Sequence, residues 1–202
     1  MKRIALALLL VACGGQASEP ATPATQAPAA DPTPATEAHA HPHGAPAPAA
    51  KNAVDPTEAK LDEVARIHGE AGPWAVLGYR MSEYAMETLG LARGSFDVSI
   101  VHWSPKEVQY SCIADGAAAH SGASLGKLNL SMVEASADNV LTVYRDKKTG
   151  RAIALRPTAS FKKRFADVPR GQARALGRDV LALPRAELFE EVGIAQAKAE
   201  TH

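Results

Sequence analysis

A segment rich in proline and alanine divides this 202-residue chain and limits what the chain can fold into. From Gly14 to about Ala50 the residues are mostly Pro, Ala and Thr, as in EPATPATQAPAADPTPATEAH, with almost no large apolar side chain. Such a segment cannot bury enough surface to offset the entropy lost on ordering, so we expect a disordered tether over residues 13–53. The remaining length predicts one folded domain over 54–194 and a polar tail over 195–202.

The residues before the tether have the layout of a bacterial secretion signal. Lys2 and Arg3 precede an apolar run, Ile4 to Val11, that is too short to span a bilayer. The exit sequence LVAC resembles the bacterial lipobox, in which the cysteine is acylated. This resemblance predicts a signal peptide over 1–12 and a lipid anchor on Cys13. We therefore expect a lipoprotein of the bacterial cell envelope that is held at the membrane and faces the periplasm.

The charge balance gives no reason to expect a nucleic-acid partner, because 22 basic and 22 acidic residues leave a formal net charge of zero. Within the tether, His39, His41 and His43 of HAHPHG could collect a metal ion. A solvated tail in which these histidines have no specific role fits the same residues.

Two helices are expected at the start of the domain. The first follows Asp55 as N-cap, has Pro56 at its first position and ends at Gly69. Its apolar stripe consists of Leu61, Val64, Ala65 and His68. This spacing puts a histidine on the buried face. The second helix is expected over residues 73–89, with a glycine at position 90 as its stop.

The next segments predict strands and one further helix. Alternation in SFDVSIVHWS puts Phe96, Val98, Ile100 and His102 on one face of a strand. The piece EVQY is expected to be extended, and Ser111 to cap a helix of small, closely packed residues that ends at position 122. Three strands are expected within 127–135, 139–146 and 151–157, the last two joined by a hairpin turn at KKTG.

Two helical segments, over 170–181 and 185–192, are expected to close the domain. The order of helices and strands lacks the strand-helix alternation of a doubly wound fold. We therefore predict an α+β fold in which helices flank an antiparallel sheet.

The stretch HSGASLGKLN, residues 120–129, does not have the spacing of a phosphate-binding loop. Only three residues separate Gly122 from Gly126, and Lys127 is followed by Leu128 instead of the Ser or Thr that a Walker loop needs.

One thiol remains in the chain once the lipobox cysteine is acylated. Cys112 could be an inert core residue, a nucleophile, a metal ligand or half of an intermolecular disulfide, and its place at a helix start favours the thiolate. Thiolate and imidazole together suit zinc or copper. The helical rise puts His120 about 12 Å away, too far to share one ion directly. His68 and His102 are the inward-facing partners, and Asp115 is a further ligand or orients a histidine.

Four stretches of the domain resemble the FmdE family, which is named for a component of formylmethanofuran dehydrogenase. They are HGEAGPWAVLGYRM (68–81), SCIADGAAAHSGASLGKLNL (111–130), YRDKKTGRAIALRP (144–157) and LPRAELFEEV (183–192). The family's motifs read H-G-H-x-x-P, then G-Y-R, and later C-x-x-D-x-x-x-x-x-T-G-C-T-x-G-K-G-N. The resemblance implies an α+β domain, often a homodimer, whose pocket holds a transition metal, with zinc the first candidate.

Carried over residue by residue, the resemblance assigns His68 and Cys112 as metal ligands. It also assigns Asp115, Lys127 and Asn129 to the pocket.

The chain departs from the family at three positions. Glu70 stands in place of a second histidine, Ala123 in place of a cysteine and Leu128 in place of a glycine. The missing thiol at position 123 implies the loss of a strong ligand. Glu70, His102 and His120 are the further candidate ligands that would compensate, because carboxylate and imidazole also bind zinc.

The sequence therefore predicts an envelope-anchored lipoprotein that binds a transition metal or a metal-bearing cofactor through His68 and Cys112. Two alternatives stay open: an enzyme of unknown substrate that depends on the metal or the thiol, with Glu70 as acid or base, and a structural lipoprotein with a degenerate site. A formyl dehydrogenase role is not expected, because an envelope lipoprotein has no access to a cytoplasmic methanofuran complex.

Overall fold

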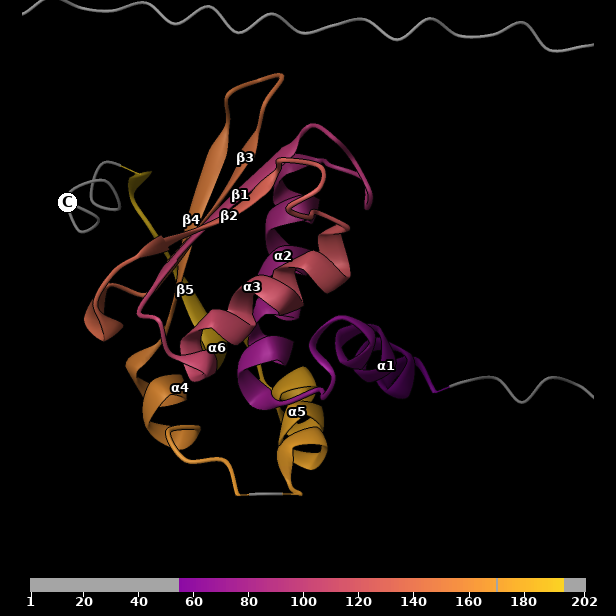
Figure 1. The fold of residues 1–202 in the computed structure, drawn as a ribbon, viewed down its shortest axis with the longest axis vertical. Helices are drawn as coiled ribbons and strands as arrows, with labels where there is room; N and C mark the ends of the chain where they lie inside the picture. The colour runs from indigo at the N-terminus through magenta and orange to yellow at the C-terminus, as the bar shows by residue number, and fades with distance from the viewer. Residues whose placement is uncertain (1–54, 170, 195–202) are drawn as a thin grey trace, which may run out of the picture. The chain divides into compact units, whose positions relative to one another are not determined.

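The computed structural model describes residues 55–169 and 171–194 (Figure 1). The predicted signal peptide, Cys13, the tether with its three histidines and the polar tail lie outside the described residues. The helices are α1 (Pro56–His68), α2 (Pro73–Leu89), α3 (Val108–Ser121), α4 (Ala159–Arg164), α5 (Ala173–Ala182) and α6 (Arg185–Leu188), with a short 3-10 turn at Ala137–Asn139. The strands are β1 (Val98–Ser104), β2 (Leu130–Glu134), β3 (Leu141–Asp146), β4 (Ala152–Pro157) and β5 (Phe189–Val192). Within the described residues, no helix has the length and apolarity needed to cross a membrane.

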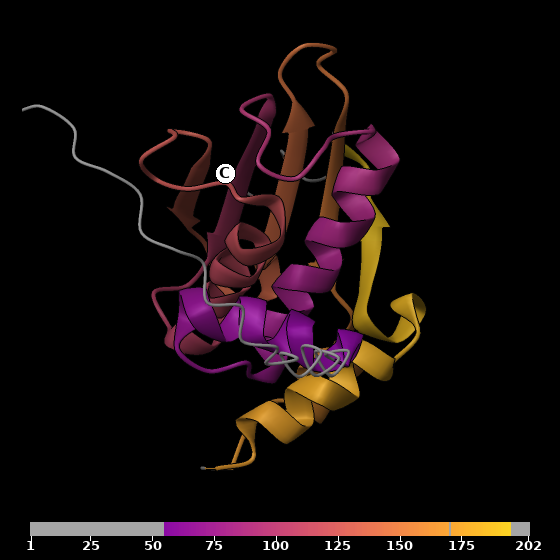
Figure 2. The ribbon, with the colours of Figure 1, turned by 90° about the vertical axis from the view of Figure 1, so that its right-hand side faces the viewer.

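The strands form one mixed sheet in the order β2-β1-β3-β4-β5. Three of its pairs are antiparallel, whereas β1 and β2 are parallel, with Ile100 opposite Leu130. The parallel pair follows from α3, which connects β1 to β2 and returns the chain to the starting end of the sheet. The α+β prediction is confirmed, and the sheet is mixed instead of wholly antiparallel. Helices α2 and α3 lie against one face of this sheet (Figures 1 and 2).

The alternation predicted for the first strand is confirmed within its bounds. Val98, Ile100 and His102 are buried beneath the helices, and the residues between them are partly exposed. The prediction was wrong for Phe96, which precedes β1 and is 64% exposed. The strand begins only at Val98, so the pleat that would bury Phe96 does not reach it.

The predicted start and end of α1 are confirmed. The side chain of Asp55 accepts a hydrogen bond from the backbone N–H of Thr57 at 2.8 Å, which satisfies one of the free donors at the helix start. Gly69 ends the helix at φ +91°, a backbone angle that favours glycine. His68 is thereby fixed as the last residue of α1.

Helices α2 and α3 pack so closely that their backbones touch at two glycines. A Cβ atom on Gly116 would lie 1.7 Å from the carbonyl oxygen of Ala75, and one on Gly78 would lie 2.1 Å from that of Ile113. No side chain fits at either position. The small residues of α3 were expected to serve close packing, and this contact confirms it.

The GYR part of the first motif has a structural role. Nη1 of Arg80 donates to the carbonyl oxygens of Val180, Leu181 and Leu183 at 3.3, 2.6 and 3.5 Å. These carbonyls lie at the end of α5, where a helix leaves its last acceptors without partners. Arg80 therefore holds the end of α5 against α2.

Three local predictions were wrong. The piece EVQY is not extended, because α3 begins at Val108, and Ser111 lies inside the helix instead of capping it. The short helix α4, whose start is capped by the side chain of Thr158, was not predicted. The segment 185–192 is helical only to Leu188 and then forms β5, because its backbone pairs with the edge of β4. A partner strand distant in sequence outweighs the local helical pattern.

Candidate functional site

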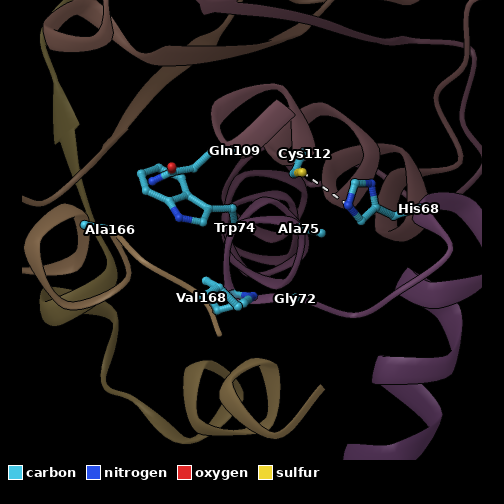
Figure 3. Close-up of a pocket in the computed structure, with 9 residues that line it drawn as sticks. His68, Gly72, Trp74, Ala75, Gln109, Cys112, Ala166 and Val168 are labelled. Atoms are coloured by element: carbon cyan, nitrogen blue, oxygen red, sulfur yellow. Dashed lines mark hydrogen bonds between the residues drawn. The ribbon is translucent and has the colours of Figure 1, made fainter. Parts of the chain in front are cut away.

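Three of the predicted site residues meet between α1 and α3. Nε2 of His68 lies 3.2 Å from Sγ of Cys112, and Nδ1 of the same ring lies 2.8 Å from Oδ2 of Asp115. Cys112 and Asp115 are one helical turn apart on α3, so both face the end of α1. Figure 3 shows the side chains of Cys112 and His68 pointing toward each other. The structure thus forms a carboxylate–imidazole–thiol chain.

The electrostatics of this chain favour a charged imidazole. The hydrogen bond to Asp115, followed by that to Cys112, raises the pKa of His68 from 6.5 to about 10, although burial opposes the shift. Near neutral pH both ring nitrogens therefore carry protons, and His68 donates to the carboxylate on one side and to the sulfur on the other. A metal ion at Nε2 must displace one of these protons.

The position of Cys112 within α3 changes one expectation. Because α3 begins at Val108, Cys112 lies more than one turn into the helix, and its Sγ donates to the Val108 carbonyl oxygen at 2.8 Å. The helix dipole acts mainly within the first turn. The thiolate therefore gains less from the dipole than a cysteine at the helix start would, and its main polar neighbour is His68.

A cavity of about 300 Å³ opens beside the thiol. Besides His68 and Cys112, its lining consists of Gly72, Pro73, Trp74, Ala75, Gln109, Ala166 and Val168. The Trp74 side chain is held by its Nε1, which donates to the Phe165 carbonyl oxygen at 2.8 Å, and by edge-to-face contact with Tyr110. Figure 3 shows Trp74, Gln109 and Val168 around the space beside Cys112. A small, mostly apolar molecule can thus reach the sulfur.

The other two candidate histidines lie elsewhere. His102 is fully buried, with Nδ1 2.9 Å from Oγ1 of Thr142 and Nε2 3.1 Å from the Tyr110 carbonyl oxygen. Burial lowers its pKa to about 4. His120 lies at the far end of α3, where Nδ1 is 3.1 Å from Oγ of Ser82, and burial lowers its pKa. Both rings are held by partners other than Cys112 and His68.

The remaining candidates also lie outside this cavity. Glu70 is exposed at the turn after α1. Nζ of Lys127 donates to the Gly122 carbonyl oxygen at 2.8 Å, which caps the end of α3. The buried Asn129 accepts from the backbone N–H of Ser124 at 3.0 Å. Lys127 and Asn129 therefore hold the loop after α3 in shape.

The missing cysteine at position 123 does not leave a gap at the site. Ala123 is buried in the core just past the end of α3, eleven residues from Cys112. The helical rise puts that position about 15 Å from Cys112. A thiol there could not share an ion with Cys112 of the same chain. The resemblance implied that the alanine at position 123 removes a metal ligand. That loss therefore does not affect an ion bound by His68 and Cys112.

Sequence reasoning missed most of the cavity wall. Trp74 was expected only as part of the helix over 73–89, and Gln109 as part of an extended piece, although both line the space beside Cys112. The position of Trp74 directly after the histidine motif could have indicated that it lies near the site. No such signal existed for Ala166 and Val168, because the connection that contains them carries no motif. In the part of the chain that the structure describes, no group of three or more His, Cys, Asp or Glu side chains is placed to hold a metal ion.

Fold and site together define an α+β domain with a His–Cys pair at the mouth of a small cavity. A family model described as "FmdE, Molybdenum formylmethanofuran dehydrogenase operon" matches residues 67–190, which is more than half of the chain and includes the whole site. The chain therefore belongs to the FmdE family. A search of curated proteins finds no match.

Proposed function

We propose that this protein is an envelope lipoprotein whose FmdE domain binds a transition metal ion, with zinc the first candidate, through Nε2 of His68 and Sγ of Cys112. The observation that carries the proposal is the 3.2 Å separation of these two atoms beside a cavity. Imidazole and thiolate are the donors that zinc takes most readily in proteins.

The separation fits two ligands of one ion. Tetrahedral zinc with bonds of about 2.1 Å to nitrogen and 2.3 Å to sulfur holds these atoms about 3.6 Å apart. A shift of a few tenths of an ångström at either side chain would open the pair to that distance. Metal-bound histidines usually donate their second N–H to a carboxylate, and Asp115 accepts from Nδ1 of His68 in this way.

Two protein ligands leave coordination positions open. These positions face a cavity with room for a small molecule, so a metal-bearing cofactor or a metal with an added ligand fits as well as a bare ion. The metal would act as a Lewis acid on whatever enters beside Trp74. The lipid on Cys13 would keep this domain at the membrane.

Metal analysis of the purified chain tests the proposal. Wild type should bind about one zinc ion per chain, and His68→Ala and Cys112→Ser should each lose it. His120→Ala is the matched control, because it removes a half-buried histidine of the same helix bundle outside the site. A wild-type protein that holds no metal and takes up none from zinc, copper or nickel would contradict the proposal.

A second function is favoured by the same three residues. Cys112, His68 and Asp115 follow one another as thiol, imidazolium and orienting carboxylate, an order that favours the thiolate in covalent catalysis. The imidazolium would stabilise the Cys112 thiolate, which could add to a carbonyl carbon of a molecule in the cavity. As the S–C bond forms, the C=O π bond breaks and the carbonyl oxygen takes the proton from Nε2 of His68. The protein would then be a thiol enzyme without a metal.

Thiol alkylation separates the two functions. If Cys112 binds zinc, added zinc should slow the reaction with iodoacetamide at least tenfold, because the sulfur lone pairs are engaged. If the thiol acts alone, zinc should leave the rate unchanged, and Asp115→Asn should lower it by disturbing His68. Ser131→Ala, at an exposed position of β2 outside the site, should react like wild type in both cases.

Mass analysis of the chain extracted from a bacterial membrane fraction tests the anchor separately. An acylated amino terminus at Cys13 is expected. A protein with an intact leader and an unmodified Cys13 would refute this part of the proposal.

A further inference from the structure

Three large apolar side chains are exposed at the end of the domain opposite the start of α3. Phe96 is 64% exposed, Leu125 73% and Leu128 91%. They come from two separate connections, the one before β1 and the one after α3. Exposed apolar side chains that gather at one place indicate a contact surface, whereas scattered ones do not.

Backbone hydrogen bonds join these connections into one surface. The N–H of Gly94 donates to the Ser121 carbonyl oxygen at 2.7 Å, and the N–H of Lys147, in the hairpin between β3 and β4, donates to that of Asp97 at 2.8 Å. Figures 1 and 2 show the hairpin and both loops at the upper end of the molecule. We call residues 91–97, 122–129 and 145–151 the loop end.

The backbone presents Leu128 to solvent at a conformational cost. Its φ of +52° makes it the one non-glycine residue with positive φ among the described residues. A branched side chain disfavours this conformation. Because the side chain is 91% exposed, its packing against the described residues offsets little of that cost. The loop thus holds an apolar group outward where a smaller residue would fit the backbone better.

The loop end is also strongly basic. Its six cationic residues are Arg93, Lys127, Arg145, Lys147, Lys148 and Arg151, and its anionic residues are Asp97 and Asp146. These residues sum to +4, and Glu63, which pairs with Arg93 at 2.6 Å, reduces the local charge to +3, against a formal charge of zero over the whole chain. Nζ of Lys127 lies 5.1 Å from the ring centroid of Phe96, so a cation lies directly beside one of the exposed apolar side chains.

We propose that the loop end docks on an anionic lipid membrane, with Phe96, Leu125 and Leu128 entering the interface and the surrounding cations meeting lipid phosphates. Apolar side chains ringed by lysine and arginine are the combination that binds the membrane interface. The choice of a lipid surface rests on the proposed lipid anchor, which keeps the domain beside a membrane. Cys112 lies ten residues before Gly122, about 15 Å back along α3, so the docked domain keeps its cavity away from the lipid.

Vesicle sedimentation of the full chain carrying Cys13→Ala tests the proposal without an attached lipid. The parent is compared with the pair Leu125→Gln, Leu128→Asn, in which asparagine suits the positive φ and keeps the loop folded. The control pair is Ile67→Gln, Met132→Gln, which removes two exposed apolar side chains outside the loop end. All these proteins keep the same leader, so differences between them report on the domain.

The loop-end pair should partition about tenfold more weakly than the parent into phosphatidylcholine vesicles that contain phosphatidylglycerol, and the control pair should match the parent. Added salt, or omission of phosphatidylglycerol, should narrow the difference between the parent and the loop-end pair. Equal partitioning of parent and loop-end pair would overturn the proposal. So would sedimentation in solution showing that the loop-end pair converts a dimer into a monomer, because the surface would then contact a second copy.

The result is separable from that for the anchor. Vesicle binding that depends on the loop end, together with an unmodified Cys13 in membrane extracts, would refute the proposed anchor and leave the docking surface standing. An acylated Cys13 with no contribution from the leucine pair would refute the docking surface alone.

Discussion

Nδ1 of His68 lies 2.8 Å from Oδ2 of Asp115, and this contact decides what the opposite nitrogen of the ring can do. The carboxylate holds a proton on Nδ1, so Nε2 is the only ring atom left for a metal or a thiol. In the metal-free protein Nε2 is protonated as well, because the pKa of His68 is raised to about 10. Metal binding must therefore release this proton, and zinc affinity should rise with pH.

Asp115→Asn should lower the pKa of His68 from about 10 toward 6.5, because the hydrogen bond to Asp115 is the largest cause of its raised value. Histidine ring signals in NMR titrations of the metal-free chain measure the shift, and Asp138→Asn is an exposed control. A raised pKa stabilises the fold fully below 6.5, and this contribution is lost as pH rises from 6.5 through about 10. A wild-type His68 that titrates near 6.5 would contradict the assignment.

His102 should give the fold the opposite dependence on pH. Burial lowers its pKa from 6.5 to about 4, so the unfolded chain takes up a proton before the folded one does. The stabilising contribution is present above pH 6.5 and is lost as pH falls through 4. Thermal melts of wild type and His102→Gln should therefore differ most near neutral pH and converge toward pH 4. A constant difference between the two proteins would show that His102 does not titrate in this range.

The glycines between α2 and α3 should not accept alanine. A Cβ on Gly116 would collide with the Ala75 carbonyl oxygen, so Gly116→Ala should cost about 3 kcal/mol or more of unfolding free energy, and Gly78→Ala a similar amount. Gly126→Ala is the matched control, because its Cβ would meet nothing closer than 4.0 Å. Urea unfolding measures all three. A Gly116→Ala protein as stable as the control would show that the helices can separate at little cost.

Much of the fold could be predicted because its signals are local. The caps Asp55 and Gly69 define α1, the apolar alternation defines β1, and Gly150 defines the hairpin with φ +75°. The small residues of α3 indicated close packing before any partner helix was known. Each of these signals acts through the backbone or the nearest turn, so it depends little on the rest of the chain.

What could not be predicted depends on contacts between distant segments. The parallel placement of β2 and the conversion of residues 189–192 into β5 both require a neighbouring strand. At the site, the sequence periodicity predicted that His68 and His102 both face inward. Only His68 contacts Cys112, because the end of α1 lies against α3, whereas His102 on β1 contacts Thr142. Residue spacing along the chain limits which side chains could bind one ion, but it does not show which elements contact each other in the fold.

Replacing Leu128 with glycine should stabilise the protein. A branched side chain at a φ of +52° costs about 1 kcal/mol, and packing of the 91% exposed leucine side chain offsets little of that cost. Leu128→Gly should therefore raise the unfolding free energy by roughly 0.5 kcal/mol, after allowance for the greater freedom of glycine in the unfolded chain. Leu125→Gly is the control. It should destabilise or be neutral, because Leu125 does not have a positive φ. Equal effects at the two positions would refute the strain at Leu128.

Arg80→Met should loosen α5 from the rest of the domain. The guanidinium of Arg80 donates to Leu181 and to two neighbouring carbonyl oxygens, and methionine keeps the packing of the stem while it removes these donors. We expect a loss of about 2 kcal/mol and faster hydrogen exchange at the carboxyl end of α5, with α3 protected as before. Lys163→Met, at an exposed position of α4, should change neither quantity. Because the segment that walls the cavity at Val168 leads into α5, a ligand in that cavity should restore part of the protection lost in Arg80→Met.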